Sequence, residues 1–246
     1  MAQYFAYDYR GAPFVQAGAA HIGMLLVLLS VAVVFWRWEH AGSTRKLARS
    51  LLAALLILNE LGWHIWHAYH GLWSLQSLLP LNLCNLMVLA SAWVLLTKNQ
   101  IGYDFVYLLG IPAAAQVLIT PALGIYGFPH FLFLQIFISH GGIVLAAIYL
   151  TRVEGLRPAS WRSVQRVALW AGLYTAAIFC LNLALGSNYL FLAYKPPAAT
   201  LLDYLGPWPW YILSMTAIGL ALISLMYLPF HLISRKIPGS PASSRR

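Results

Sequence analysis

Long apolar runs separated by short hydrophilic gaps make up most of the chain. A helix crosses the hydrocarbon core of a bilayer with about 20 largely apolar residues. By that rule the pattern predicts seven membrane-spanning helices, near residues 17–38, 48–69, 76–97, 102–119, 129–151, 166–186 and 208–232. The expected fold class is therefore all-α, a polytopic membrane bundle of about seven transmembrane helices.

The fourth apolar run is short, and Pro112 and Pro121 predict that it is kinked or partly re-entrant. Neither a long linker nor an internal repeat interrupts the pattern, so we expect a single transmembrane domain over residues 1–236. Residues 237–246 are rich in Pro, Gly, Ser and Arg, a composition that predicts a disordered cytoplasmic tail. Residues 1–10 lack the basic region of a signal peptide, so the first apolar run is expected to remain as a span.

Basic residues indicate the orientation of the bundle. If the N-terminus lies outside, 13 of the 15 Lys and Arg residues fall in the inner segments, and only Arg10 and Lys195 fall in the outer ones. Cytoplasmic loops of membrane proteins carry an excess of Lys and Arg. The distribution therefore predicts an N-out, C-in topology.

Composition excludes several other classes of protein. Hydrophobic residues make up 61% of the chain and charged residues only 9%, against about 25% charged in soluble domains. The net charge of +9 lies in the gaps between apolar runs, which is typical of topology determinants and not of a nucleic-acid interface. Cys84 and Cys180 both fall inside apolar runs and have neither C-x-x-C nor zinc-type spacing, so we expect no disulfide, metal or cofactor.

Polar residues within the apolar runs are the candidate functional groups, because such groups are costly in lipid unless they face the bundle interior. Glu60, His64 and His67 have the spacing i, i+4, i+7, which puts them on one helix face. Depths estimated at about 1.5 Å per residue predict that these groups meet in one outward-opening cavity. Further candidates in the apolar runs are Asn82, Cys84, Asn85, Gln135, Ser139, His140 and Asn182.

These residues are compatible with three kinds of chemistry and with a purely structural role. Cys84 with His140 as base would suit acyl transfer, with Asn82 or Asn85 as a donor to the oxyanion. Glu60, His64 and His67 could instead bind a metal or haem, or relay protons in a transporter or seven-helix sensor. A lone cysteine in an apolar helix is often a small hydrophobe, and asparagines often join helices.

Several short segments, in their order along the chain, resemble the YwaF family of bacterial integral membrane proteins, which is related to the eukaryotic transmembrane protein 164. The resemblance covers roughly residues 50–230. It rests on the segments Trp63-His64-Ile65-Trp66, Leu79-Pro80-Leu81-Asn82-Leu83-Cys84, Pro121, Phe137 to Gly141 with His140, Asn188-Tyr189-Leu190, Lys195-Pro196 and Trp208-Pro209-Trp210-Tyr211.

The resemblance implies a bacterial cytoplasmic-membrane enzyme that remodels phospholipids or lysophospholipids through a membrane-embedded cysteine. By position it implies Cys84 as nucleophile and His140 as its base, with His64, His67 or Glu60 as supporting or alternative groups. Asn82 and Asn85, with Asn182, would form the oxyanion or polar network. Lys195, with Asn188 and Tyr189, would bind the lipid headgroup. One residue departs from the family pattern, since many members have histidine at the position of Asn82.

Overall fold

The computed structural model describes residues 2–38, 42–196 and 201–236, and every regular element among them is helical. The expected all-α fold is thereby confirmed for this part of the chain. The elements are η1 (Ala2–Phe5), α1 (Ala19–Trp36), α2 (Ser43–Tyr69), α3 (Leu83–Thr97), α4 (Gln100–Phe105), η2 (Val106–Gly110), α5 (Ile111–Ile119), α6 (Phe131–Arg152), α7 (Trp161–Leu185), η3 (Tyr189–Phe191), η4 (Leu201–Leu205) and α8 (Trp210–Lys236). The expected disordered tail, 237–246, lies outside the described residues.

Six of these helical segments are long and apolar enough to cross a membrane, namely α1, α2, the continuous segment Gln100–Ile119, α6, α7 and α8. The protein is therefore an integral membrane protein. The seventh apolar helix, α3, has only 15 residues. The helix in this predicted span begins at Leu83 and not near residue 76, because residues 70–82 form turns and irregular backbone. Pro80, which lacks an N–H and disfavours helix in the residue before it, stands in this irregular stretch.

The expected kink in the fourth span takes the form of a π-helical turn. Residues Val106–Gly110 are π-helical and directly precede Pro112, which lies in the first turn of α5. A proline ring clashes with the carbonyl four residues earlier and donates no hydrogen bond, and widening the turn before it relieves both problems. The helix then ends at Ile119, just before Pro121.

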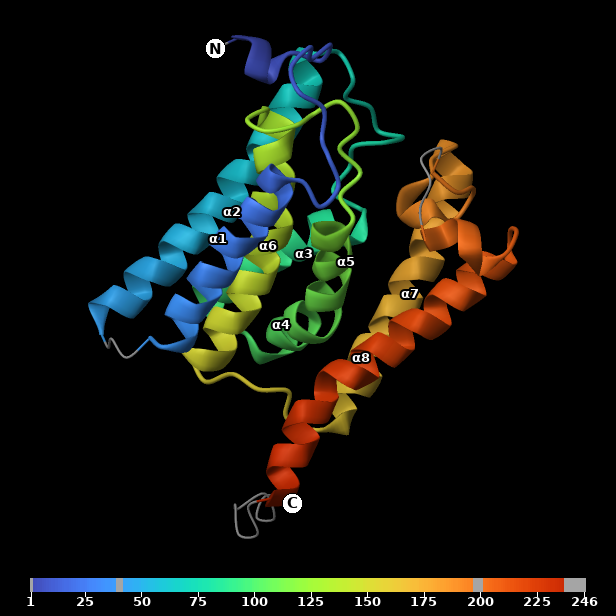
Figure 1. Ribbon diagram of the computed structural model, residues 1–246. Helices are drawn as coiled ribbons and strands as arrows, with labels where there is room; N and C mark the ends of the chain where they lie inside the picture. Colours follow the sequence, from blue (N-terminus) through green and yellow to red (C-terminus); the bar gives the residue numbers. More distant parts are fainter. Residues whose placement is uncertain (1, 39–41, 197–200, 237–246) are drawn as a thin grey trace.

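Helix α6 lies at the centre of the bundle, beside α1, α2, α3 and α5, and most of its residues are buried (Figure 1). Helices α7 and α8 form a separate pair to one side, packed mainly against the π-helical turn and α4. Large hydrophobic side chains cover the outward faces of α1, α2, α7 and α8. Exposed apolar surface of this extent is the surface that lipid covers.

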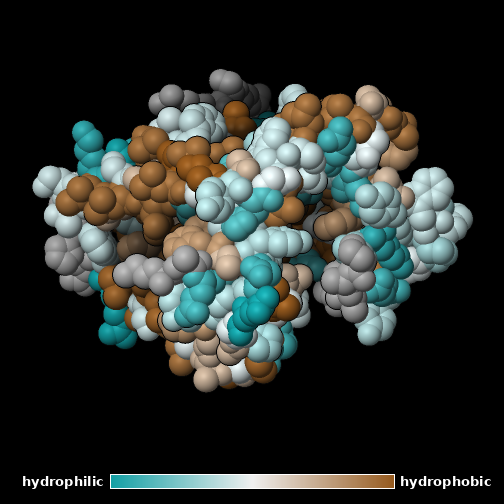
Figure 2. All heavy atoms as spheres, turned by 90° about the horizontal axis from the view of Figure 1, so that it is seen from above, coloured by the Kyte–Doolittle hydropathy of each residue, from teal (hydrophilic) through white to brown (hydrophobic). Residues whose placement is uncertain are grey.

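The N-terminal segment, residues 2–18, folds over one end of the bundle beside the C-terminal end of α2 and the loop 120–130 (Figure 1). Side chains from those two elements hold its backbone: Trp66 Nε1 and His70 Nε2 donate to Phe5 O at 2.8 and 2.9 Å. His130 Nε2 and the Tyr126 hydroxyl donate to the next two carbonyls, at 3.1 and 2.9 Å. We call this segment the N-terminal strap. Seen from that end, hydrophilic residues occupy much of the face and hydrophobic residues gather along its left and upper margins (Figure 2).

Candidate functional site

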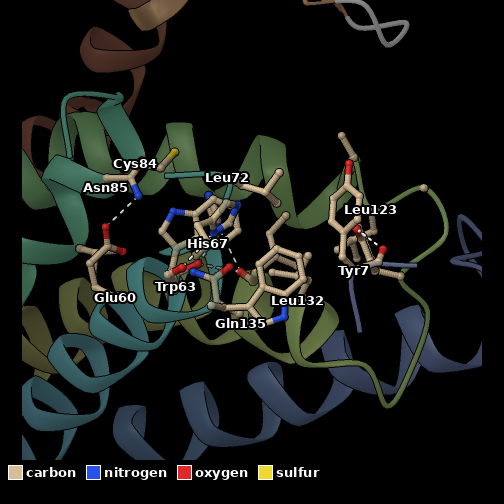
Figure 3. Close-up of a pocket in the computed structure, with 18 of the residues that line it drawn as sticks. Tyr7, Glu60, Trp63, His67, Leu72, Cys84, Asn85, Leu123, Leu132 and Gln135 are labelled. Carbon is tan, nitrogen blue, oxygen red and sulfur yellow. Dashed lines mark hydrogen bonds between the residues drawn. The ribbon is translucent and has the colours of Figure 1, made fainter. Parts of the chain in front are cut away.

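A cavity of about 640 Å³ lies between α2, the first turns of α3 and α6. Its size is within the range of small-molecule sites, about 300–1,000 Å³. Cys84, Asn85 and Glu60 lie at one end of it, and Tyr7 of the strap lies with Leu123 at the other (Figure 3). The cavity therefore extends from the cysteine to the strap.

Two helix faces bring their polar side chains to this cavity. On α2, Glu60, Trp63 and His67 are spaced i, i+3, i+7 and share one face. On α6, Gln135 and His140 lie on the cavity-facing stripe, which also carries Ser139. The remainder of the wall is largely apolar and consists of Trp66, Leu72, Val88, Ala122, Leu123, Ile125, Leu132 and Ile136, with Gly124 and Tyr126.

Cys84 is the second residue of α3, and its thiol is free. Within the described part of the chain, no group accepts a hydrogen bond from the backbone N–H groups of Leu83, Cys84 and Asn85, and Asn82 supplies no side-chain cap. The N-terminal end of a helix carries a partial positive charge. A negative charge on the sulfur, or on an oxygen bonded to an attacked carbon nearby, is stabilised at such a position.

Two histidines line the cavity with the same orientation. The Nδ1 of His140 lies 2.8 Å from the carbonyl oxygen of Ile136, and the Nδ1 of His67 lies 2.8 Å from that of Trp63. A carbonyl oxygen can only accept, so in both rings Nδ1 carries the proton and the neutral Nε2 has an available lone pair. Neither Nε2 is hydrogen-bonded to another described residue. Both cavity-lining imidazoles thus have a nitrogen that can accept a proton.

Glu60 is held by a different set of contacts. Its Oε1 accepts a hydrogen bond from Asn85 Nδ2 at 2.8 Å and lies 3.5 Å from His64 Nε2. Because His64 Nδ1 accepts from Trp73 Nε1, its proton is on Nε2 and points to the carboxylate. His64 therefore directs its N–H to the Glu60 carboxylate. It is not one of the residues that line the cavity. No group of three or more His, Cys, Asp or Glu side chains among the described residues is placed to bind a metal.

The other predicted polar residues lie away from this cavity. Asn82 Oδ1 accepts from the backbone N–H of Leu190 at 3.2 Å, and the residue lines a second cavity of about 350 Å³ with Asn188 and Tyr189. Asn182 is buried, and it bonds Ser187 and both backbone groups of Tyr189. The structure thus brings Cys84, His140, His67, Glu60 and Asn85 to one cavity and leaves Asn82 and Asn182 outside it.

The predicted headgroup residues belong to the loop that follows α7. The hydroxyl of Tyr189 donates to Leu75 O and accepts from the N–H of Leu79, so its polar atom is engaged in joining two loops. Asn188 bonds the backbone of residues 193 and 194. Lys195 Nζ lies 5.5 Å from the centre of the Tyr211 ring. Asn188 and Tyr189 therefore shape the loop that carries Lys195.

Tyr7, Tyr126 and Gln135 line the cavity, but the sequence assigned no catalytic or binding role to them. Gln135 had a detectable signal, since it is a polar residue in an apolar run, five positions before His140. Tyr7 and Tyr126 had none, because the Tyr126 hydroxyl reaches the backbone carbonyl of Tyr7 across 119 positions of sequence. Burial raises the pKa of Tyr126, which therefore remains a hydroxyl donor.

The chain matches a known protein family. The family model described as the TMEM164 family matches residues 16–227. That range includes α1 to α7 and the cavity residues other than Tyr7. No curated protein and no solved structure matches the chain.

Proposed function

The chain belongs to the TMEM164 family, and from that premise we propose that it is a lipid acyltransferase or acyl hydrolase working through a thioester on Cys84. One observation carries the proposal: a free cysteine at the N-terminal end of α3 lines the same cavity as two imidazoles with available Nε2 atoms. A thiol, an imidazole with an available lone pair and unpartnered backbone N–H groups are the kinds of group that acyl transfer requires, which supports the proposal.

In the first half-reaction, His140 Nε2 takes the proton of the Cys84 thiol, and the sulfur attacks the ester carbonyl carbon of a phospholipid. The oxyanion accepts hydrogen bonds from the unpartnered N–H groups at the start of α3. The carbon–oxygen bond then breaks, and the leaving alkoxide takes the proton back from His140. The products are a lysophospholipid and an acyl group in thioester linkage to Cys84.

In the second half-reaction, the hydroxyl of an acceptor lipid, or water, attacks the thioester. Its proton passes to an imidazole Nε2, the carbon–sulfur bond breaks, and the thiolate takes up the proton. His67 supports this step as an alternative base, because it also lines the cavity and its Nε2 is not protonated. Glu60 acts indirectly, by orienting Asn85 beside Cys84. Lys195, on the loop after α7, is the proposed point charge for a headgroup phosphate.

For the membrane arrangement we propose seven spans with the N-terminus outside, in a bacterial cytoplasmic membrane. Helix α3 provides about 22 Å at 1.5 Å per residue, less than the hydrocarbon thickness of about 30 Å. The irregular segment 70–82 would complete this third span. Irregular backbone is tolerated at membrane depth where it is buried in protein or lines a cavity, and residues 76, 77 and 82 line the second cavity.

The test is detection of the acyl-enzyme by intact-protein mass spectrometry after incubation with phosphatidylcholine vesicles. We expect a hydroxylamine-labile adduct on wild type and on the Cys180→Ala variant, whose cysteine is exposed on α7. Cys84→Ala should form no adduct, and His140→Gln should form it about 10²–10⁴-fold more slowly, the usual cost of losing a general base. A wild-type protein that is never acylated by any phospholipid class would refute the proposal.

One observation favours a second candidate, a proton-coupled transporter or seven-helix sensor. Glu60 is buried, paired with His64, and its Oε2 has no partner among the described residues. An intramembrane carboxylate of this kind is a common proton-relay group. For transport, Glu60→Gln should abolish solute flux into proteoliposomes while Cys84→Ala leaves it unchanged, the reverse of the pattern expected for acyl transfer.

A further inference from the structure

Gln135 is a largely buried residue of the cavity wall, and its side-chain amide has no hydrogen-bonding partner among the described residues. The residue is 7% exposed, and only its backbone carbonyl is engaged, by Asn59 Nδ2 at 3.2 Å. Its side-chain amide faces the cavity that it lines (Figure 3). Because the amide is open to the cavity, it can form a hydrogen bond with a ligand there, and such a bond contributes about 0.5–1.5 kcal/mol. A ligand that hydrogen-bonds this amide therefore gains affinity that an apolar wall would not provide.

The neighbouring polar groups have other roles. Ser139 Oγ donates to the carbonyl of Ile136 and lies 2.9 Å from His140 Nδ1, and Asn85 Nδ2 donates to Glu60. Their contacts orient the base and hold the start of α3. The Gln135 amide takes part in neither of these contacts.

Charge restricts the ligand group that Gln135 can receive. None of the described residues that line the cavity is Lys or Arg. Glu60, a buried carboxylate, lies on the same wall, so a phosphate in this cavity would meet a negative group and no counter-ion. Desolvating an unpaired anion is very costly. An anionic group is therefore excluded at Gln135, and a neutral hydrogen-bonding group is compatible with the amide.

We propose that Gln135 binds the free glycerol hydroxyl of an acceptor lipid such as a lysophospholipid, whose phosphate remains outside the cavity. This inference rests on the proposed function and names the acceptor of its second half-reaction. The amide Nε2 donates to the hydroxyl oxygen, and the hydroxyl proton points to an imidazole Nε2 of the cavity. When the oxygen attacks the thioester carbon, that nitrogen takes the proton and the carbon–sulfur bond breaks. Gln135 thus favours a lipid hydroxyl over water as acceptor.

The experiment compares two probes on the Cys84→Ala background, where no covalent step takes place. One probe is 1-acyl lysophosphatidylcholine and the other is the same lipid with its free hydroxyl methylated. Dissociation constants are measured by native mass spectrometry in detergent for this background alone, with Gln135→Leu added, and with Gln116→Leu added. Gln116 is the matched control, because it is an exposed glutamine on α5 outside the cavity.

We expect the hydroxyl probe to bind about tenfold more tightly than the methylated probe in the background and in the Gln116→Leu control. With Gln135→Leu, the two probes should bind almost equally, because the contact that distinguishes them is lost. Equal binding of both probes to the background, or an undiminished preference in Gln135→Leu, would overturn the inference.

A second measurement separates this inference from the proposed function. In proteins that retain Cys84, the ratio of acyl transfer to hydrolysis is followed with labelled phosphatidylcholine as donor. Gln135→Leu should raise the KM for lysophosphatidylcholine and lower that ratio about tenfold. If wild type forms no thioester, the proposed function fails while the binding comparison still decides the role of Gln135. If the thioester forms and the ratio is unchanged, only the role of Gln135 is refuted.

Discussion

Acidification should loosen the N-terminal strap through His130. This residue precedes α6, is fully buried, and its Nδ1 accepts a hydrogen bond from the N–H of Leu132 at 3.1 Å while Nε2 donates to Ala6 O. The ring stacks on Tyr126 and contacts the ring of Tyr9 in a tilted arrangement. A protonated imidazole has two donors and no acceptor. Protonation therefore removes the acceptor that caps the first turn of α6.

The direction of the effect follows from the pKa. Burial is the main cause that lowers the pKa of His130 below its ordinary value of 6.5; nearby His70 lowers it further, and the bond to the Ala6 carbonyl partly opposes the shift. The opened segment binds the proton more readily, so the stability contributed by neutral His130 is complete above about pH 6.5 and decreases as the pH falls below it. Loss of a side-chain N-cap costs about 0.5–2 kcal/mol. We therefore expect the population of opened strap to rise about 2- to 30-fold at pH 5.

Amide hydrogen exchange measures this opening in peptides that cover residues 3–9 and 128–134, corrected for the intrinsic pH dependence of exchange. The matched variant is His130→Asn, because asparagine caps a helix by accepting the same N–H and does not titrate. Wild type should lose protection between pH 7.5 and pH 5, and His130→Asn should not. Equal protection of wild type at both pH values, or the same loss in the variant, would refute the reasoning.

Three further predictions concern packing, the loop after α7 and topology. Gly142→Ala should lower the thermal unfolding temperature in detergent by the equivalent of about 1–3 kcal/mol, because its Cβ would lie 2.5 Å from the Cδ2 atom of buried Leu56. Gly172→Ala, with no atom within 4 Å of the new Cβ, should be neutral or stabilising, and equal effects would contradict this argument. Asn182→Leu should cost about 1–3 kcal/mol and expose the loop 186–196 to proteolysis; unchanged cleavage would mean that its three bonds are unimportant. An N-terminal tag should react with impermeant reagents on intact cells, and its protection would contradict the N-out topology.

The grouping of polar residues around one cavity was accessible from the sequence for a physical reason. A polar group in an apolar helix must face the protein interior, so the i, i+7 spacing of Glu60 and His67 selects one face of α2. The same reasoning predicts that His140 faces the protein interior from α6, and the residue lines the cavity. This reasoning failed where a polar group is satisfied locally: Asn182 bonds its own following loop. The chemical roles of Glu60, His67 and His140 remain predictions.

The late start of α3 and the strap were not predictable from the same pattern. Hydropathy treats residues 76–97 as one apolar run, whereas the helix begins at Leu83, where its first N–H groups become available to the site. The strap is held by bonds to the carbonyls of Phe5, Ala6 and Tyr7, and every residue type has such a carbonyl. Hydrogen bonds to backbone carbonyls therefore cannot be predicted from the types of residue along the sequence.

The position of α3 also bears on Asn82, the position at which the resemblance given by the sequence leads us to expect histidine. Its side chain turns towards Leu190 and the second cavity, while Cys84, two positions later, lines the first. A histidine in the same orientation would contact the loop after α7, not the thiol. The imidazoles that line the cavity with Cys84 are those of His140 and His67, and both are present here. The departure at Asn82 therefore alters the junction between α3 and that loop and leaves the proposed cysteine–histidine chemistry complete.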